Sequence, residues 1–281
     1  MIDPAIKAYY DRAPEESRLQ SGPSQLEELR TRELVLRHAP KPPATVVDVG
    51  GGAGPYAFWL AGLGYDVRLI DAVPRLIAVA QSRNEAAAAR LASCTVADAR
   101  ALPEDNGTAA MVLMLGPLYH LVRREDRLAA LGEAARVLRP GGVLIAAGIS
   151  RWASSLDGLS RELLRDPEFA LIMERDLVDG NHQNPTSHLD YFTTAYFHRP
   201  DDLPRELSDA GFDVEQLYGI EGPAWLLPDF DERWNNPERR EIILRVARAL
   251  ETERSVIGCS AHLLAVGRKP NAGGKPLRIL T

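Results

Sequence analysis

Hydrophobic and polar positions follow a regular rhythm between residues 44 and 150 of this 281-residue chain. Short, almost wholly apolar runs alternate there with longer stretches in which apolar residues recur every three or four positions. The short runs are typical of strands buried on both faces, and the longer stretches are typical of amphipathic helices. This alternation predicts an α/β fold with a parallel sheet that helices cover on both faces.

The rhythm breaks twice after Ser150. Residues 151–199 are predicted to be a mixture of helix and polar loop, and the alternation then returns with a helix and the strand DVEQLYGI. Residues 221–254 form a second irregular and then helical stretch, which is followed by a last strand within SVIGCSAHLLAVGRK. We expect these two interruptions to form a helical cap on the core.

A glycine-rich turn, VVDVGGGAGPY at residues 46–56, joins the first predicted strand to a helix that begins near Pro55. Its Gly50, Gly52 and Gly54 form a G-x-G-x-G pattern. Glycine destabilises regular structure by roughly 0.5–1 kcal/mol relative to alanine, so several together indicate a positive φ or a ligand held against bare backbone. The free N–H groups of a helix start favour a carboxylate or a phosphate. A turn without a ligand is the alternative.

Two aspartates follow the next two predicted strands. Asp71 ends the second strand, where an acid in nucleoside-binding sites accepts hydrogen bonds from the ribose. Asp98 follows the third strand, where its carboxylate could accept from an adenine amino group while the N–H of Ala99 meets a ring nitrogen. An ordinary strand-end or turn aspartate is the alternative in each case. The turn and both acids predict an adenosine-like ligand; Pro55 weakens the dinucleotide pattern G-x-G-x-x-G without excluding it.

The ordered set VVDVGGGAG, LIDAVP, VADARALP, AAMVLMLG and LRPGG resembles class I S-adenosylmethionine-dependent methyltransferases over residues 44–149. The stretch GPLYHL at residues 116–121 is similar to a subset of bacterial enzymes of this family. The predicted strands at 212–218 and 260–266 fit the family's terminal antiparallel hairpin. The resemblance implies a Rossmann-like, doubly wound sheet that is mostly parallel with a C-terminal antiparallel strand.

The resemblance also implies S-adenosylmethionine as the cofactor and S-adenosylhomocysteine as its product. The cofactor residues implied by position are Tyr10, Gly50, Gly51, Gly52, Asp71, Asp98, Ala99 and Leu115. In this arrangement the three glycines lie against the methionine part, the first acid binds the ribose, and Leu115 with Gly116 passes beneath the sulfonium. Tyr10 is placed like a lid residue in similar enzymes, and core packing is its alternative.

The expected organisation has three parts. The Rossmann-like core is predicted to comprise residues 44–150, 200–220 and 255–269. Residues 1–43 are predicted to form an N-terminal helical lid. The interruptions at 151–199 and 221–254 are predicted to form the substrate cap.

Methyl transfer from a sulfonium is a direct displacement. The enzyme must align the nucleophile with the methyl carbon, exclude water and, for some acceptors, remove a proton. Tyr119 and His120 follow the fourth predicted strand, at the edge where the family usually transfers the methyl group. His120 is the first candidate base because we expect its pKa to lie near the working pH. Packing at the start of a helix is its alternative role.

A polar and aromatic segment, DGNHQNPTSHLDYFTTAYFHRP at residues 179–200, holds three of the six histidines. We interpret it as the substrate wall, with His182 as a further catalytic candidate, because loops often carry function. His182 and His188 could bind a metal with Asp190, but no recognised ligand spacing supports this and we predict no metal. The tryptophans within residues 221–254 either close the pocket or pack the insertion.

The charge balance bears on the acceptor. A net charge of −6 differs from the basic balance usual in nucleic-acid binders, so a small-molecule acceptor with an O, N or activated C nucleophile is favoured. An RNA-directed methyltransferase ranks lower, because Leu115-Gly116-Pro117-Leu118 replaces the Asn/Asp-Pro-Pro-Tyr/Phe pattern of many amino-methylating nucleic-acid enzymes. A non-methylating protein that binds S-adenosylmethionine or a nucleotide is a further alternative.

Hydropathy and the N-terminus bear on location. No apolar run approaches the roughly 20 residues that span a membrane, and the N-terminus is too polar for a secretory signal. We therefore expect a cytoplasmic protein with no membrane partner. Both a monomer and a homodimer remain open.

Overall fold

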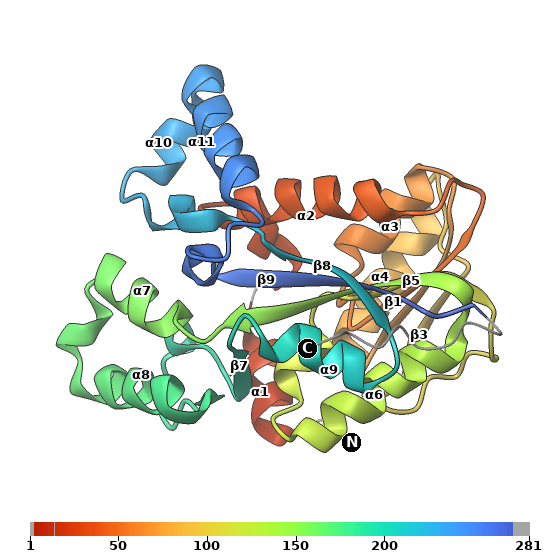
Figure 1. The fold of residues 1–281 in the computed structure, drawn as a ribbon, viewed down its shortest axis with the longest axis horizontal. Helices are drawn as coiled ribbons and strands as arrows, with labels where there is room; N and C mark the ends of the chain where they lie inside the picture. Colours follow the sequence, from red (N-terminus) through yellow and green to blue (C-terminus); the bar gives the residue numbers. More distant parts are fainter. Residues whose placement is uncertain (1–2, 14, 272–281) are drawn as a thin grey trace, which may run out of the picture.

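A central sheet with helices on both faces dominates the structure (Figure 1). The computed structural model describes residues 3–13 and 15–271 of the chain. Its strands are β1 (Thr45–Val49), β2 (Asp66–Asp71), β3 (Ser93–Val96), β4 (Ala109–Met114), β5 (Leu138–Ser150), β6 (Asn181–His182), β7 (Ala195–His198), β8 (Asp213–Gly219) and β9 (His262–Arg268). The predicted α/β class is confirmed.

The main sheet has the strand order β3-β2-β1-β4-β5-β9-β8. Strands β1 to β5 pair in parallel, whereas β9 is antiparallel to both β5 and β8. This arrangement confirms the prediction of a Rossmann-like, mostly parallel sheet with a C-terminal antiparallel strand. Because β1, β2 and β4 are parallel, the loops that follow them gather at one edge of the sheet, where open α/β sheets bind ligands.

Two apolar layers hold the helices on the sheet. Helices α2 (Ser24–His38), α3 (Pro55–Gly62) and α4 (Pro74–Ala86) contribute to one layer, and α6 (Arg124–Val137) and α9 (Asp202–Asp209) contribute to the other. Adjacent strand residues serve opposite faces, so Val46 and Val47 are both fully buried but lie in different layers. Strands buried on both faces explain the nearly continuous apolar runs of the sequence.

The segment after β5 contains two short strands that the sequence pattern did not predict. Strand β5 continues beyond its pairing with β4, and its last residues Ile149 and Ser150 pair in parallel with Phe197 and His198 of β7. Strand β6 then pairs antiparallel with β7. An open edge of β5 therefore recruits residues that have too few apolar neighbours to be recognised as a strand from the sequence alone.

The remaining helices lie around the edge where the ligand loops gather and at the adjoining end of the molecule (Figure 1). The α-helices are α1 (Pro4–Arg12), α5 (Pro117–His120), α7 (Ala153–Ser160), α8 (Pro167–Asp179), α10 (Phe230–Asn235) and α11 (Pro237–Leu250). The 3-10 helices are η1 (Glu15–Gln20), η2 (Leu163–Arg165), η3 (Leu189–Tyr191), η4 (Gly222–Leu226) and η5 (Ile257–Cys259). Leu26 of α2 packs in one apolar cluster with Trp234 of α10 and Leu244 of α11, which joins the N-terminal helices to the second insertion.

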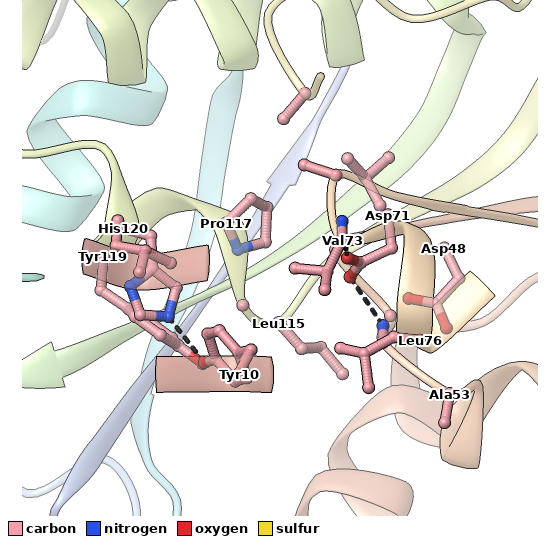
Figure 2. A pocket seen from close by; sticks show the side chains of 18 of the residues that line it. Tyr10, Asp48, Ala53, Asp71, Val73, Leu76, Leu115, Pro117, Tyr119 and His120 are labelled. Atoms are coloured by element: carbon pink, nitrogen blue, oxygen red, sulfur yellow. Dashed lines mark hydrogen bonds between the residues drawn. The ribbon is translucent and has the colours of Figure 1, made fainter. Parts of the chain in front are cut away.

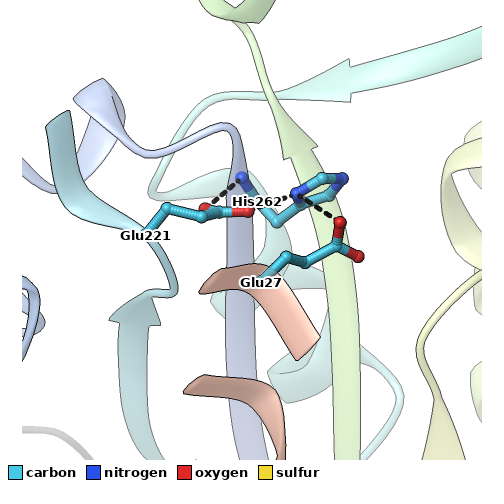
Figure 3. Close-up of side chains that lie close together, drawn as sticks. All are labelled: Glu27, Glu221 and His262. Carbon is cyan, nitrogen blue, oxygen red and sulfur yellow. Dashed lines mark hydrogen bonds and ion pairs between the residues drawn. The ribbon is translucent and has the colours of Figure 1, made fainter. Parts of the chain in front are cut away.

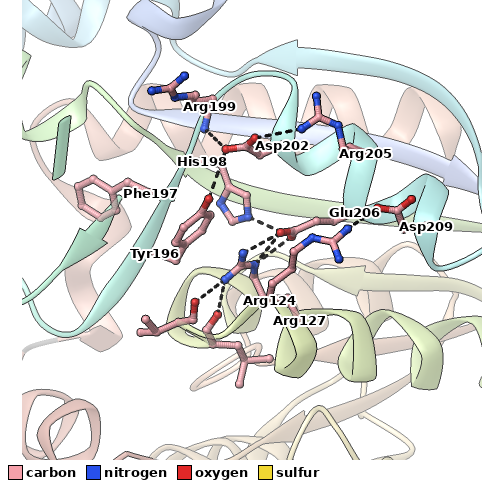
Figure 4. A network of polar contacts seen from close by, with 12 residues as sticks. Arg124, Arg127, Tyr196, Phe197, His198, Arg199, Asp202, Arg205, Glu206 and Asp209 are labelled. Atoms are coloured by element: carbon pink, nitrogen blue, oxygen red, sulfur yellow. Dashed lines mark hydrogen bonds and ion pairs between the residues drawn. The ribbon is translucent and has the colours of Figure 1, made fainter. Parts of the chain in front are cut away.

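A buried charge network fixes the short helix α5 to the rest of the fold (Figure 4). The Arg127 guanidinium donates to the carboxylate of Glu206 at 2.7 to 3.0 Å and to the carbonyls of Leu121 and Val122 at 2.8 and 2.7 Å. His198 of β7 lies 3.4 Å from the same carboxylate. These contacts join α6, α9 and β7 around the loop that directly follows His120.

None of the helices in the described part of the chain is both long and apolar enough to cross a lipid bilayer. The cytoplasmic location and the oligomeric state stay predictions.

Candidate active site

Two positions in the turn after β1, Gly50 and Gly51, leave no space for a side chain. Gly50 has φ +71°, and a Cβ on it would lie 2.6 Å from Cδ of Pro117. A Cβ on Gly51 would lie 2.5 Å from Oδ2 of Asp48 and 2.6 Å from a methyl carbon of Leu69. The turn therefore presents bare backbone to the space above it, as the sequence predicted from its glycines.

Asp71, at the end of β2, is tied to this turn (Figure 2). One carboxylate oxygen accepts from the N–H of Gly52 at 2.8 Å, and the other accepts from the N–H of Val73 at 2.8 Å. The side chain is buried, and burial raises its pKa above the usual aspartate value, although the two backbone hydrogen bonds act in the opposite direction. Asp71 thus connects the ends of β1 and β2 at the wall of a cavity.

A cavity of about 680 Å³ opens over the carboxyl ends of β1, β2 and β4. Every residue that the resemblance assigned to the cofactor lies in its wall, namely Tyr10, Gly50, Gly51, Gly52, Asp71, Asp98, Ala99 and Leu115. Tyr119 and His120 line the same cavity. Figure 2 shows the two acids of β1 and β2 on one side and the pair of Tyr10 and His120 on the other.

Asp48 is a residue of this cavity that the sequence analysis did not select. It is 1% exposed, and neither carboxylate oxygen has a hydrogen-bond partner within residues 3–13 and 15–271. Burial and the nearby Asp71 raise the pKa of Asp48 to about 7. Its signal in the sequence was a charged residue inside an otherwise apolar strand.

Asp98 lies in the cavity wall but already binds a cation. Its two oxygens accept from the Arg100 guanidinium at 2.6 and 2.9 Å, and Arg100 also pairs with Asp126 at 2.9 Å. These contacts hold the pKa of Asp98 well below its usual range. The backbone N–H of Arg100 donates a third hydrogen bond to Asp98 at 3.0 Å. A carboxylate has about four acceptor sites, and the adenine contact predicted for Asp98 stays a proposal.

Tyr10 and His120 form a direct pair between the N-terminal helix and α5. The Tyr10 hydroxyl lies 2.7 Å from Nε2 of His120, and Nδ1 lies 3.1 Å from the carbonyl oxygen of Thr194. Because the carbonyl can only accept, Nδ1 carries the proton and Nε2 accepts from Tyr10. Burial lowers the pKa of His120 to about 4, so the expectation of a pKa near the working pH was wrong.

A second cavity of about 250 Å³ adjoins the first. The two share Tyr10, Arg18 and Tyr119 in their walls. The second cavity lies between the core, the lid helix and both insertions, and its aromatic wall is made by Tyr9, Tyr10, Tyr119, Phe169, Tyr191, Phe192, Phe197 and Trp225. Part of the predicted substrate wall at 179–200 therefore lines a cavity, together with residues that no sequence motif marked.

His182 lies in this second cavity rather than beside the glycine turn. Its Nδ1 is 2.8 Å from the Asp176 carboxylate, and its Nε2 is 2.8 Å from the carbonyl oxygen of Tyr191. Both ring nitrogens are therefore engaged inside the insertion. We assign His182 a structural role there and do not use it as a proton acceptor.

His262 lines the same cavity, and Glu27 and Glu221 cluster around its ring (Figure 3). The three have the ligand types of a metal site, but each carboxylate already has a partner that carries positive charge. Glu27 accepts two hydrogen bonds from Arg18, at 2.6 and 2.9 Å, and Glu221 lies 2.6 Å from Nδ1 of His262. Although burial acts against it, these two carboxylates raise the pKa of His262 to about 9. Ion pairing explains the cluster without a metal.

Comparisons with known proteins support a methyltransferase. Residues 46–142 match the family model of a methyltransferase domain. No curated protein matches the chain.

Several solved structures share the fold at low sequence identity. An S-adenosylmethionine-dependent methyltransferase from Methanosarcina mazei has a TM-score of 0.56 at 16% identity, covering 85% of this chain and 98% of that one. A methyltransferase from Haloferax volcanii, solved with the Trm112 methyltransferase activator, has a TM-score of 0.60 at 19% identity, covering 96% and 100%. The cyclase SpnF has a TM-score of 0.56 at 17% identity, covering 88% and 81%. At these identities the likeness concerns the fold.

Proposed function

We propose, from the premise that this chain carries a class I S-adenosylmethionine-dependent methyltransferase domain, that it methylates a small molecule bound in the smaller cavity. The observation that carries the proposal is the junction of the two cavities at Tyr10, Arg18 and Tyr119. A donor in the larger cavity and an acceptor in the smaller one would meet at this junction. The volume of about 250 Å³ suits a small acceptor better than a polynucleotide.

The residues of the larger cavity fit the donor. The side-chain-free backbone at Gly50 and Gly51 leaves room for its methionine part, and Asp48 is a buried acid in the wall beside it. We propose that Asp71 binds the ribose and that Asp98 and Ala99 hold the adenine. When bound, S-adenosylmethionine supplies an electrophilic methyl carbon on a positively charged sulfur.

Residues at the junction would align the reaction and exclude water. Tyr10 comes from the lid helix, and its hydroxyl donates to the neutral His120, so this pair would hold α1 against α5 over the methyl group. Tyr119 would complete the wall between donor and acceptor. We propose His120 as the residue that positions Tyr10, because a group with a pKa of about 4 is a weak proton acceptor near neutral pH.

Two other functions have specific observations behind them. The Haloferax volcanii structure pairs a methyltransferase with a protein activator, so a partner-dependent enzyme is a second candidate. The RNA-directed methyltransferase that the sequence left as an alternative is considered with it. The cyclase SpnF has a similar fold, so an enzyme that catalyses a reaction other than methyl transfer is a further candidate. The acidic net charge and the small volume of the acceptor cavity favour a small-molecule acceptor over RNA.

Binding and product release test the proposal together. S-Adenosylhomocysteine should bind the wild-type protein in calorimetry, and Asp71→Ala should weaken binding at least about tenfold, since a hydrogen bond to a charged group contributes roughly 1.5–3 kcal/mol. Release of S-adenosylhomocysteine from S-adenosylmethionine should require a small-molecule acceptor and should not respond to RNA. Unchanged affinity in the variant would remove Asp71 from the site, and RNA-dependent release would favour the second candidate.

A further inference from the structure

We propose that the acceptor of this enzyme is an amine that arrives as an ammonium ion, an inference that rests on the proposed methyltransferase function. It follows from three properties of the smaller cavity. Its wall is largely aromatic, and the ion pairs around it leave one carboxylate in excess. The histidines in its wall, within the described residues, offer no effective base at neutral pH.

The aromatic wall is built for contact with a cation or a flat ring. Tyr9 lies edge-on to Tyr10 with ring centroids 5.3 Å apart, and edge-on to Phe192 at 5.5 Å. Phe192 adopts φ +63°, a conformation that costs a bulky residue about 1–3 kcal/mol and tends to persist at functional sites. Faces of such rings attract ammonium groups within about 6 Å.

The charges around the cavity do not balance. The positive charge of Arg18 is neutralised by Glu27, and that of His262 is neutralised by Glu221. Asp157 and Asp190 instead share one guanidinium, that of Arg161, at 3.2 and 3.5 Å. One carboxylate charge is therefore left over beside the aromatic wall.

Asp157 is the better placed of the two acids. Its side chain is 29% exposed, whereas that of Asp190 is 75% exposed. Burial raises the pKa of Asp157 above its usual value, although Arg161 acts in the opposite direction. An approaching ammonium would restore the charge partner that Asp157 only partly has.

The chemistry of the junction also favours an amine over an alcohol. An alcohol is a weak nucleophile unless a base removes its proton, and the histidines that line the two cavities are poorly suited to that task. His120 has a pKa near 4, His262 is already protonated with a pKa near 9, and both nitrogens of His182 are engaged. An amine needs only to lose the extra proton of its ammonium form.

The atoms balance for this acceptor. The ammonium passes one proton to the partly exposed Asp157 and from there to water. The nitrogen lone pair then forms a bond to the methyl carbon as the carbon–sulfur bond breaks, and that electron pair stays on sulfur as S-adenosylhomocysteine. The positive charge moves from sulfur to the methylated nitrogen, which remains beside the aromatic rings and the carboxylate.

Matched probes test the inference on the full chain loaded with S-adenosylhomocysteine. Calorimetry at pH 7 would compare 2-phenylethylamine, which is an ammonium ion there, with 2-phenylethanol and with phenylacetate. The ammonium probe should bind about tenfold or more tightly than the alcohol, and the carboxylate should bind most weakly. Asp157→Asn should remove most of the preference for the ammonium and leave the alcohol unchanged. Glu174→Gln, an exposed acid on α8 outside the cavity, is the matched control and should retain the preference.

The outcomes separate this inference from the proposed function. Equal binding of ammonium and alcohol, or tighter binding of phenylacetate, by wild-type protein that binds S-adenosylhomocysteine would overturn the amine acceptor and leave methyl transfer intact. Failure of S-adenosylhomocysteine to bind would instead overturn the proposed function. The comparison of probes uses wild-type protein, so it decides the question even if Asp157→Asn does not fold.

Discussion

The hydroxyl of Tyr10 lies 2.7 Å from Nε2 of His120, and this contact joins residues that are 110 positions apart in the chain. Tyr10 comes from the first helix, α1, and His120 comes from the short helix α5, which follows β4 in the sequence. Because both line the larger cavity, the contact closes the N-terminal helix over the proposed donor site. Burial of the ring lowers its pKa and keeps His120 neutral, although the hydrogen bond to the Thr194 carbonyl acts in the opposite direction.

Tyr10→Phe should lower turnover while leaving the affinity for S-adenosylhomocysteine within about threefold of wild type. The variant keeps the ring but loses a hydrogen bond, whose net contribution is roughly 0.5–1.5 kcal/mol, so a decrease in kcat of up to about tenfold is expected. Release of S-adenosylhomocysteine and calorimetry would measure the two effects. Tyr65→Phe, which also loses a hydroxyl hydrogen bond but lies outside both cavities, serves as the control.

The pH profile separates a positioning role from a basic one. If His120 only positions Tyr10, the pH profile of kcat/KM should have the same shape near pH 6.5 in wild type and in His120→Gln, because the pKa of His120 lies near 4. An inflection near pH 6.5 that this variant abolishes would make His120 the general base and contradict the assignment.

The ion-pair cluster around His262 should make stability depend on pH. The pKa of His262 is about 9 in the folded chain and near 6.5 without its partners, so its contribution is fully present below pH 6.5 and is lost as pH rises through 9. The change is on the order of 3 kcal/mol. Denaturant unfolding at pH 6.5 and 9 should show this loss in wild type and a much smaller one in His262→Gln.

An exposed histidine provides the comparison for His262. His188→Gln should keep the wild-type pH dependence, because the His188 side chain lies at the surface. Treatment with a chelator should change neither stability nor activity if the cluster is held by ion pairs alone. Loss of stability on chelation would identify Glu27, Glu221 and His262 as a metal site.

Alanine substitutions of Gly51 and Gly52, the two central glycines of the turn, should impair the protein for different reasons. Gly51→Ala should lower the free energy of unfolding by about 1–3 kcal/mol, because its Cβ would collide with Asp48 and Leu69. A Cβ on Gly52 would meet only a methyl carbon of Leu76 at 3.7 Å, so strain at φ +58° is its main cost, about 1 kcal/mol. Gly52→Ala should therefore be more stable than Gly51→Ala. Its main defect should be weaker cofactor binding rather than a lower free energy of unfolding. The opposite order in thermal unfolding would show that the turn is not packed as described.

Much of the core could be predicted because its signals are local. Apolar runs, turn glycines and the acids at strand ends each lie within a few residues of the feature they determine. Strand β7 could not be predicted in this way, since Ala195–His198 becomes a strand only where β5 offers an open edge. Local pattern does not report such a partner.

The candidate site likewise has features that local sequence predicts and features that depend on distant contacts. The cofactor residues follow strands in a regular order, so their gathering in one cavity could be anticipated from topology. The low pKa of His120 could not be anticipated, because it depends on burial of the ring under Tyr10 and beside Thr194, which come from distant parts of the chain. Arg18 and Asp157 belong to no motif, and only the packing of the lid and the insertion brings them to the smaller cavity.

The buried pair of Arg127 and Glu206 should be worth far more to the fold than an exposed pair on the same helix (Figure 4). Arg127→Ala would leave the Glu206 carboxylate and the carbonyls after His120 without their donor, so the free energy of unfolding should fall by about 3–5 kcal/mol. Arg124 also pairs with an acid of α9, Asp209, but both side chains are nearly half exposed, and Arg124→Ala should cost at most about 1 kcal/mol. Denaturant unfolding of the two variants measures the difference directly. Similar losses in both would mean that the network does not hold α5 in place, and the positioning of His120 would need another explanation.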